Sequence, residues 1–452
     1  MNEPTGSMHE ASGRMTFEAA QEWLLARARD AGLAIEVLGQ SNRELTLAAQ
    51  NGSLEQVTEA ERAGIGIRLV DGEGRAGYAY TEDLGVEALA WALAEARENA
   101  GLLEPGDARI EPGRALGHSD SVGDGLAEPL AQKLETVLGF EEDLRADPRV
   151  RQVPIARYME REARLSLAST GGARGSYRNG AAGLLTSLVM AEGESLKQGF
   201  EIALETDFHA LDPGRTARTA IAATGRLLGA RPLPSGRYTA WFEPRVFAQL
   251  LSAFSGLFSG KQVLEGKSRL AGRLGQRIAG EAFTLIDDPT LPGRIGSRPF
   301  DAEGRPAAPL TLVDRGQLRA FLHNAETARA LDQPNSGHAW RSYRGPLDVA
   351  PSNLYVPAGP GLQPATGVIV TDLMGLHAGA NPISGDFSLQ ALGLELRGGE
   401  LAAPVENFAV SGNFLDLLQR IVGLGDTLEW HFMGACVGAP MVEVDGLSFA
   451  GA

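Results

Sequence analysis

The chain contains one cysteine, Cys436, in 452 residues, so it cannot form an internal disulfide bond. It also lacks a charged segment followed by an apolar run and a cleavage site, the pattern of a secretory signal peptide. No uninterrupted apolar stretch approaches the roughly twenty residues needed to cross a bilayer. These absences predict a cytoplasmic protein that is not embedded in a membrane.

Basic residues are also scarce. The sequence has 41 lysines and arginines against 57 aspartates and glutamates, which gives a formal net charge of −16. Nucleic-acid binding depends largely on lysine and arginine side chains that neutralise phosphates. An acidic surface repels phosphates, so we expect no direct DNA or RNA partner.

The length and composition indicate a globular protein of two domains. Hydrophobic residues make up 43% of the chain, and its 57 glycines are spread out, as expected for turns. The clearest linker is segment 229–236, where Pro232 and Pro234 remove backbone donors. We predict a loose tail at 1–14, an N-terminal α+β domain at 15–230 and a C-terminal β-rich domain at 231–452.

The N-terminal domain is predicted to pack helices on an antiparallel sheet. Apolar residues recur at helical spacing after Thr16, a plausible N-cap, and again over 85–100, 129–144 and 213–228. Alternating apolar and polar residues predict antiparallel strands with one solvated face. The expected strands are short: 34–38, 44–49, 54–60, 64–70, 76–80, 150–158, 162–169, 183–191 and 199–204.

The C-terminal domain is predicted to contain few helices. A strand at 238–242 precedes a helix at 244–258, and a second helix is expected at 413–421. Between and after them lie many short strands separated by glycine turns. This pattern favours a mostly antiparallel β domain, either a curved sheet or an open barrel.

Three sequence motifs typical of catalytic or ligand-binding sites are present only in part. Gly266-Lys267-Ser268 resembles the end of a phosphate-binding loop, but Lys261 occupies the position that requires glycine. Gly117-His118-Ser119-Asp120 lacks the closing glycine of a nucleophile elbow. His9-Glu10 could open a zinc-binding helix, but Gly13 stands where the second histidine is needed. We therefore expect none of these three activities.

Cys436 leaves two interpretations open. A lone cysteine is most often a small buried apolar residue. Its small neighbours, Gly434, Ala435, Gly438 and Ala439, would let a metal or a backbone approach closely, but would equally suit tight sheet packing. The histidines are scattered singly, and none forms a pair at the spacing of helical metal ligands.

A series of segments in a fixed order resembles the bacterial TldD/PmbA family, also called the modulator of DNA gyrase or TldD/TldE peptidase family. The resemblance extends over nearly all of the chain after Met15 and includes GIGIR (64–68) and GYAY (77–80). The C-terminal matches are RPLPSGRY (231–238), SRLAGRLG (268–275), RPFDAEG (298–304), TDLMG (371–375), SGDFS (384–388), PVEN (404–407), SGN (411–413) and GLSFAG (446–451).

The resemblance implies a specific zinc site in one of the family's two subunit types. In the TldD type, a helix carries His-Glu-x-x-x-His, which supplies two zinc ligands and a general base, and a cysteine near the C-terminus completes the site. In this chain the corresponding positions are Leu251, Ser252 and Gly256. None can perform the required role, so we expect no catalytic residue and no bound metal here, with Cys436 an isolated candidate ligand.

The chain therefore resembles the TldE/PmbA type, which lacks the zinc motif. This resemblance implies a non-catalytic subunit of a cytoplasmic heterodimer that acts on unfolded peptides, with zinc held by a TldD-like partner. The gyrase name implies DNA biology, but the acidic charge counts against direct contact with DNA. Two alternatives remain open: a homodimeric peptide-binding or scaffolding protein, and an autonomous hydrolase with a relocated site that draws on Cys436 and His431.

Overall fold

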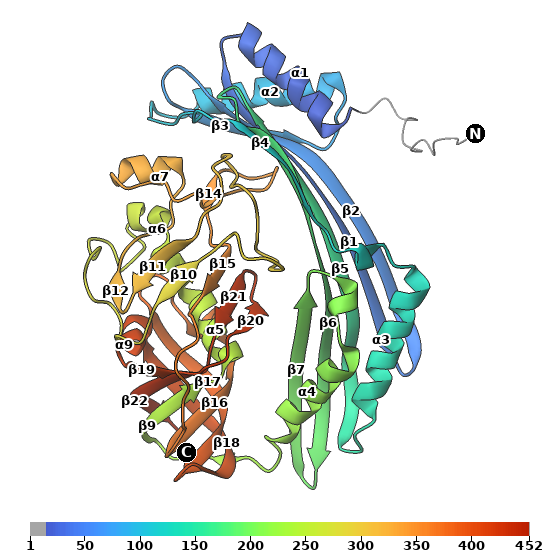
Figure 1. The fold of residues 1–452 in the computed structure, drawn as a ribbon, viewed down its shortest axis with the longest axis vertical. Helices are drawn as coiled ribbons and strands as arrows, with labels where there is room; N and C mark the ends of the chain where they lie inside the picture. Colours follow the sequence, from blue (N-terminus) through green and yellow to red (C-terminus); the bar gives the residue numbers. More distant parts are fainter. Residues whose placement is uncertain (1–14, 452) are drawn as a thin grey trace.

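A computed structural model describes residues 15–451, which fold into an α+β structure (Figure 1). The tail expected at 1–14 and the His9-Glu10 pair lie outside the described residues. Within residues 15–451, none of the helices combines the length and apolarity needed to span a membrane.

The first half of the chain forms one large sheet with the strand order β3-β2-β1-β5-β6-β4, and β7 also pairs with β6. All neighbours in this sheet are antiparallel except β4 and β6. The strands are β1 (Ala34–Gln50), β2 (Ser53–Val70), β3 (Ala76–Thr81), β4 (Ala115–Ser121), β5 (Val150–Ser169), β6 (Arg174–Glu192) and β7 (Ser195–Glu205). The helices are α1 (Phe17–Asp30), α2 (Val86–Gly101), α3 (Leu130–Arg145) and α4 (Pro213–Gly225), with short 3-10 turns at η1 (Asp124–Ala127) and η2 (Phe208–Ala210).

The strands of this sheet are longer than the sequence pattern predicts. The expected strands at 34–38 and 44–49 are one continuous strand, β1, and the same is true of β2 and β5. Polar residues in the middle of β1 suggested a break. They do not interrupt the strand because both of its edges are paired: Asn42 lies opposite Arg62 on β2 and Ala163 on β5. Backbone hydrogen bonding, rather than side-chain polarity, sets the strand length here.

The two faces of the sheet pack against different partners. Ile35 and Val37 on β1 belong to the core under α1 and α2. Leu38, the next residue, points to the opposite face and packs with Phe300 from the second half of the chain. This alternation follows from the two-residue period of a strand. The sheet is therefore covered by helices on one face and meets the C-terminal half on the other (Figure 1).

The second half contains a closed barrel in which β9, β16, β17, β18 and β22 pair in a ring. Pairing of Ala409 with Ala450 and of Val410 with Phe449 closes it. Arg231 and Pro232, expected in a linker, form the short strand β8 beside β18. The barrel strands and their attachments are β8 (Arg231–Pro232), β9 (Gly236–Phe242), β16 (Gly367–Met374), β17 (Asp386–Arg397), β18 (Glu400–Asn413), β19 (Ile421–Leu424) and β22 (Val442–Ala450).

A smaller sheet lies beside the barrel in the order β12-β11-β10-β15-β21-β20. The remaining strands are β10 (Leu285–Asp287), β11 (Leu310–Asp314), β12 (Gln317–Leu318), β13 (Ala339–Trp340), β14 (Asp348–Val349), β15 (Asn353–Tyr355), β20 (Glu429–Phe432) and β21 (Cys436–Ala439). The helices of this half are α5 (Pro244–Phe254), α6 (Gly260–Leu264), α7 (Ala325–Ala330), α8 (Leu376–Gly379) and α9 (Phe414–Gln419), with the 3-10 turn η3 (Ser255–Phe258) directly after α5.

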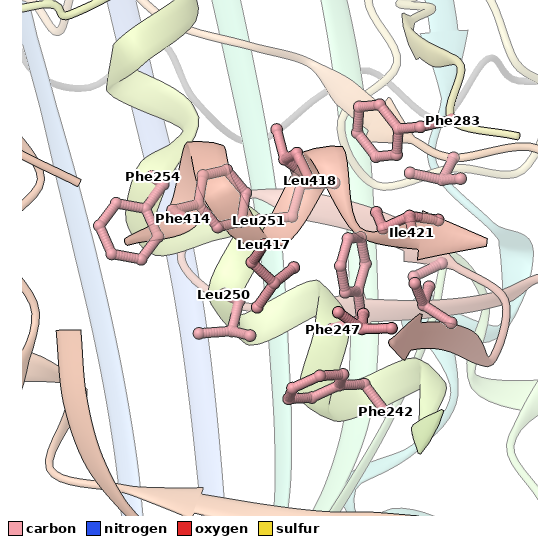
Figure 2. Packing of buried hydrophobic residues seen from close by; sticks show 14 of the residues in the cluster. Phe242, Phe247, Leu250, Leu251, Phe254, Phe283, Phe414, Leu417, Leu418 and Ile421 are labelled. Atoms are coloured by element: carbon pink, nitrogen blue, oxygen red, sulfur yellow. The ribbon is translucent and has the colours of Figure 1, made fainter. Parts of the chain in front are cut away.

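Helix α5 forms the centre of the C-terminal core (Figure 2). Its buried residues lie on more than one side of the helix, as expected for a helix enclosed by protein. Phe254 at its end stacks on Phe414 of α9 with ring centroids 4.6 Å apart. The helix predicted at 244–258 is thus correct in position, although its last turn is 3-10.

Two close approaches join the halves. Phe300 packs against Leu38 and meets Tyr177 of β6 edge to face at 5.2 Å. The backbone of Tyr343 passes directly over Gly66 of β2, where a side chain would collide with the Tyr343 carbonyl oxygen. The Tyr343 hydroxyl also donates a hydrogen bond of 2.6 Å to Glu82. Glycine at position 66 is therefore required by the docking of the two halves.

The Gly66→Ala substitution is expected to lower the free energy of unfolding by roughly 1–3 kcal/mol, because an added methyl group must displace backbone. Gly139→Ala on α3 is the matched control, since nothing lies within 4 Å of its added Cβ. Thermal and denaturant unfolding of both variants would test the prediction. Equal stability of the two variants would contradict the described docking.

Candidate functional site

A cleft of about 540 Å³ lies between the two halves. Side chains of β1, β5 and β6 line it from the sheet, and loops of the C-terminal half line it from the other side. Cys436 lies at this cleft, together with Phe432 and Ser352. Concave sites between domains are common places for ligands to bind, so this cleft is the candidate site.

The Cys436 thiol faces the cleft and the loop at 294–297. In the β20–β21 hairpin, Cys436 lies opposite Phe432, whereas Val437 lies opposite His431. The nearby backbone N–H groups of Gly296 and Ile295 and the charge of Arg294 favour the thiolate. Burial is the stronger effect, however, and it raises the pKa of the Cys436 thiol above its ordinary value. The thiol is therefore held in its weakly reactive protonated form.

His431 lies on the other face of the hairpin. Neighbouring residues of a strand point to opposite faces, so His431 shares its side with Val437 and not with Cys436. Burial, with a smaller contribution from the Arg245 charge, lowers the pKa of His431 to about 4. Its Nε2 atom has no hydrogen-bond partner within the described part of the chain. The structure does not bring Cys436 and His431 together as a nucleophile and its base.

Two of the three motif positions lie in the last turn of α5, which packs against β20 and β21, and the third follows the helix. Leu251 is fully buried and belongs to the same apolar cluster as Val437. The Ser252 hydroxyl donates a 3.1 Å hydrogen bond to the backbone oxygen of Met433. Gly256 lies in the 3-10 turn η3. These positions serve packing and hydrogen bonding.

The family's metallopeptidase zinc does not fit these residues. Leucine and glycine offer no ligand atom, and the Cys436 thiol faces the cleft rather than Leu251. Among residues 15–451, no group of three or more histidine, cysteine, aspartate or glutamate side chains is arranged to hold a metal ion. We therefore derive no chemical step through zinc in this chain.

A buried polar network lies next to the cleft and was not identified from the sequence. His338 Nε2 is 2.9 Å from Asp287 Oδ1, and its Nδ1 is 2.9 Å from the Ser336 hydroxyl. The Ser352 backbone N–H and hydroxyl both donate to Asp287. These residues come from three separate segments, around Asp287, Ser336–His338 and Ser352, so no sequence spacing signals the network. Ser352 is the member of the network that lines the cleft.

Charged groups concentrate where the cleft meets the junction of the halves. Arg68 and Glu36 form a buried ion pair of 2.7 Å. Arg341, only 3% exposed, lies near them and lines the cleft, as does Arg298. Arg298 and Glu303 fall in the segment 298–304 that resembles the family, but the sequence assigned them no role. Burial is the main cause that raises the pKa of Glu303 to about 8, with contributions from Glu36 and Asp301.

The fold and the cleft define an α+β protein in which a barrel-containing half closes over one face of a long antiparallel sheet. Two family models match the chain: PmbA/TldA metallopeptidase domain 1 over residues 35–100 and the PmbA/TldA metallopeptidase C-terminal domain over residues 235–451. The chain belongs to the PmbA/TldD family. This confirms the family resemblance seen in the sequence.

Two metalloproteases match this chain over most of their length. A metalloprotease of Methanothermobacter thermautotrophicus is 28% identical over 414 residues, covering 86% of this chain and 87% of the relative. Metalloprotease PmbA of Escherichia coli O157:H7 is 24% identical over 442 residues, covering 94% of each chain.

Solved structures share the fold. A candidate modulator of a DNA gyrase from Thermotoga maritima has a TM-score of 0.86 and 28% identity, covering 96% of this chain and 100% of that one. TldE from Thermococcus kodakarensis has a TM-score of 0.83 and 20% identity, covering 95% and 100%. The last likeness concerns the fold alone.

The raised pKa of Cys436 predicts slow reaction with a thiol-specific disulfide reagent near neutral pH. The native protein is expected to react roughly tenfold or more slowly than the chain unfolded in denaturant. Because Cys436 is the only cysteine, the coloured thiol that the reagent releases reports on the reaction of this residue alone. Equal rates in the two states would show that the thiol is exposed.

The raised pKa of Glu303 predicts a pH-dependent loss of stability. Between its ordinary value of 4.5 and about 8, the folded protein keeps a proton that the unfolded chain has released. The free energy of unfolding therefore falls as pH rises. Glu303→Gln removes the titrating group and should abolish this effect. The difference in free energy of unfolding between the variant and the wild type should therefore increase in favour of the variant between pH 5 and 8, by up to roughly 1.4 kcal/mol per pH unit. A pH-independent difference would contradict the prediction.

Proposed function

We propose that this chain is a non-catalytic, TldE/PmbA-like subunit of a cytoplasmic zinc metallopeptidase. The observation that carries the proposal is which residues occupy the three zinc-motif positions, on and just after α5. A peptidase subunit of this family needs polar side chains there, whereas Leu251 is fully buried in the apolar core and Gly256 has no side chain. A TldD-like partner would supply the zinc and the general base.

In this proposal the chain binds peptide and does not cleave it. The cleft is about 540 Å³, a size suited to a short segment of peptide or a few side chains. Gly180, Gly296 and Gly434 contribute to its lining and leave room for an extended backbone. Unfolded peptides, whose backbones are accessible, are the substrates that such a surface would favour.

The test compares the purified chain, a His-Glu-x-x-x-His protein encoded in the same genome, and their mixture. Each is assayed for hydrolysis of an unfolded peptide, with zinc added or with a chelator. The chain alone should be inactive, and the mixture should be more active than the partner alone. Chelator-sensitive hydrolysis by this chain alone, surviving further purification, would overturn the proposal.

Light scattering on the same samples separates the proposal from a scaffolding role. A heterodimer with the partner supports the proposal, whereas a homodimer unchanged by the partner contradicts it. Cys436→Ala provides a further control, because the mixture should keep its activity if this thiol takes no part in hydrolysis. A loss of activity with an intact heterodimer would instead favour a site that uses Cys436.

A further inference from the structure

The cleft is basic although the chain is acidic. The protein has a formal charge of −16, yet the cleft lining includes Arg161, Arg164, Arg298 and Arg341 against one acidic side chain, Asp348. Asp348 also has a cation of its own, since Lys261 lies 3.2 Å away. A local excess of positive charge in a narrow cleft attracts an anionic group.

Three of these arginines lack a hydrogen-bond partner for part of the guanidinium group, and in Arg298 and Arg341 two atoms lack one. Arg341 is only 3% exposed, and its Nε and Nη2 make no hydrogen bond to any residue in 15–451. The same two atoms of Arg298 are buried and unpartnered within that range. Buried polar groups without partners are rare and costly, so each requires an explanation.

The other two cleft arginines each have a side-chain partner within the fold, although the Nε of Arg164 is unpartnered among the described residues. Arg161 donates a 2.7 Å hydrogen bond to Asn42, and Arg164 donates one of 2.6 Å to Glu18. Both therefore bind to the sheet and to α1. Arg298 and Arg341 are the cleft arginines whose side chains form no hydrogen bond or ion pair within residues 15–451.

The neighbouring acids do not supply the missing partner. Glu36 is already bound to Arg68 at 2.7 Å. Asp301 accepts hydrogen bonds from the backbone N–H groups of Glu303, Arg305 and Ala339. Glu303 accepts from the Ala325 N–H, and its pKa of about 8, raised mainly by burial, keeps it largely neutral at pH 7. Arg341 is thus a buried cation without a paired anion among its described neighbours.

We propose that Arg341 and Arg298 bind a carboxylate of a peptide held in the cleft. A guanidinium presents two parallel N–H groups that match the two oxygens of a carboxylate. The adjoining residues Ala302, Ala339 and Gly296 are small and leave space beside the arginines. The carboxylate is either the C-terminus of the peptide or an acidic side chain. This inference rests on the proposed peptide-binding function and identifies the group that is recognised.

The test measures fluorescence anisotropy of N-terminally labelled octapeptides with the full chain. One peptide has a free C-terminus, the second is its C-terminal amide, and the third is the amide with one internal glutamate. The wild type should bind one or both carboxylate peptides roughly ten- to a hundredfold more tightly than the plain amide. Preference for the first identifies a terminal carboxylate, and preference for the third identifies a side chain.

Single-residue variants test which arginines bind the peptide carboxylate. Arg341→Met and Arg298→Met should lose the preference while binding the plain amide as the wild type does. Arg161→Met is the matched control, since it removes a cleft arginine that is already partnered, and it should keep the preference. Thermal unfolding checks each fold, and Arg341→Lys, which keeps the charge but loses the paired donors, replaces Arg341→Met if that variant does not fold.

Equal affinity of the wild type for all three peptides, undetectable binding of every peptide, or a preference that survives in both arginine variants would overturn the inference. Hydrolysis by the mixture with the TldD-like partner is measured in parallel. Activity of that mixture without carboxylate preference would reject the carboxylate site alone. A chain that is inactive with the partner and forms no heterodimer would reject the proposed function itself.

Discussion

The docking of the C-terminal half on one face of the long N-terminal sheet is the constraint on which the rest of the structure depends. The sheet carries apolar residues on both faces, because neighbouring residues such as Val37 and Leu38 are both apolar and point to opposite sides, and α1 to α4 cover only one face. Phe300 and Tyr343 cover part of the other face. The cleft exists because this contact is confined to one part of the sheet, which leaves polar side chains of β5 and β6 facing the loops around Cys436.

The sequence predicted those parts of the fold that depend on local patterns. Thr16 caps α1 by accepting a hydrogen bond from the Ala19 N–H, and the strand expected at 76–80 is β3, which pairs with β2. The mostly antiparallel C-terminal β domain was also predicted correctly, and it contains a closed barrel. Strand lengths were underestimated, because the polar middle of β1 is stabilised by pairing partners distant in sequence, which local patterns do not reveal.

The candidate site could be predicted only in part, for the same reason. Leu251, Ser252 and Gly256 were assigned to the motif by counting back without a gap from residues 273–275 in the family-like segment 268–275. Arg341 and Arg298 carry no such signal, since their significance lies in missing hydrogen-bond partners, which is a property of the folded structure. The hydrolase alternative that draws on Cys436 and His431 is not supported by the register of β20 and β21, which places these two residues on opposite faces of the hairpin.

The core around α5 explains why the zinc motif is not easily restored in this chain. A fully buried leucine such as Leu251 contributes roughly 1.5–3 kcal/mol through burial of its side chain. An imidazole at that position would leave at least one ring nitrogen in apolar surroundings, at a cost of roughly 1–3 kcal/mol if it stayed unpartnered. Metal binding could offset this loss of stability only if position 256 also supplied a ligand and the Cys436 thiol pointed toward the helix. The packing that stabilises this core therefore opposes a zinc motif at these positions, which supports the proposal that the metal belongs to a partner subunit.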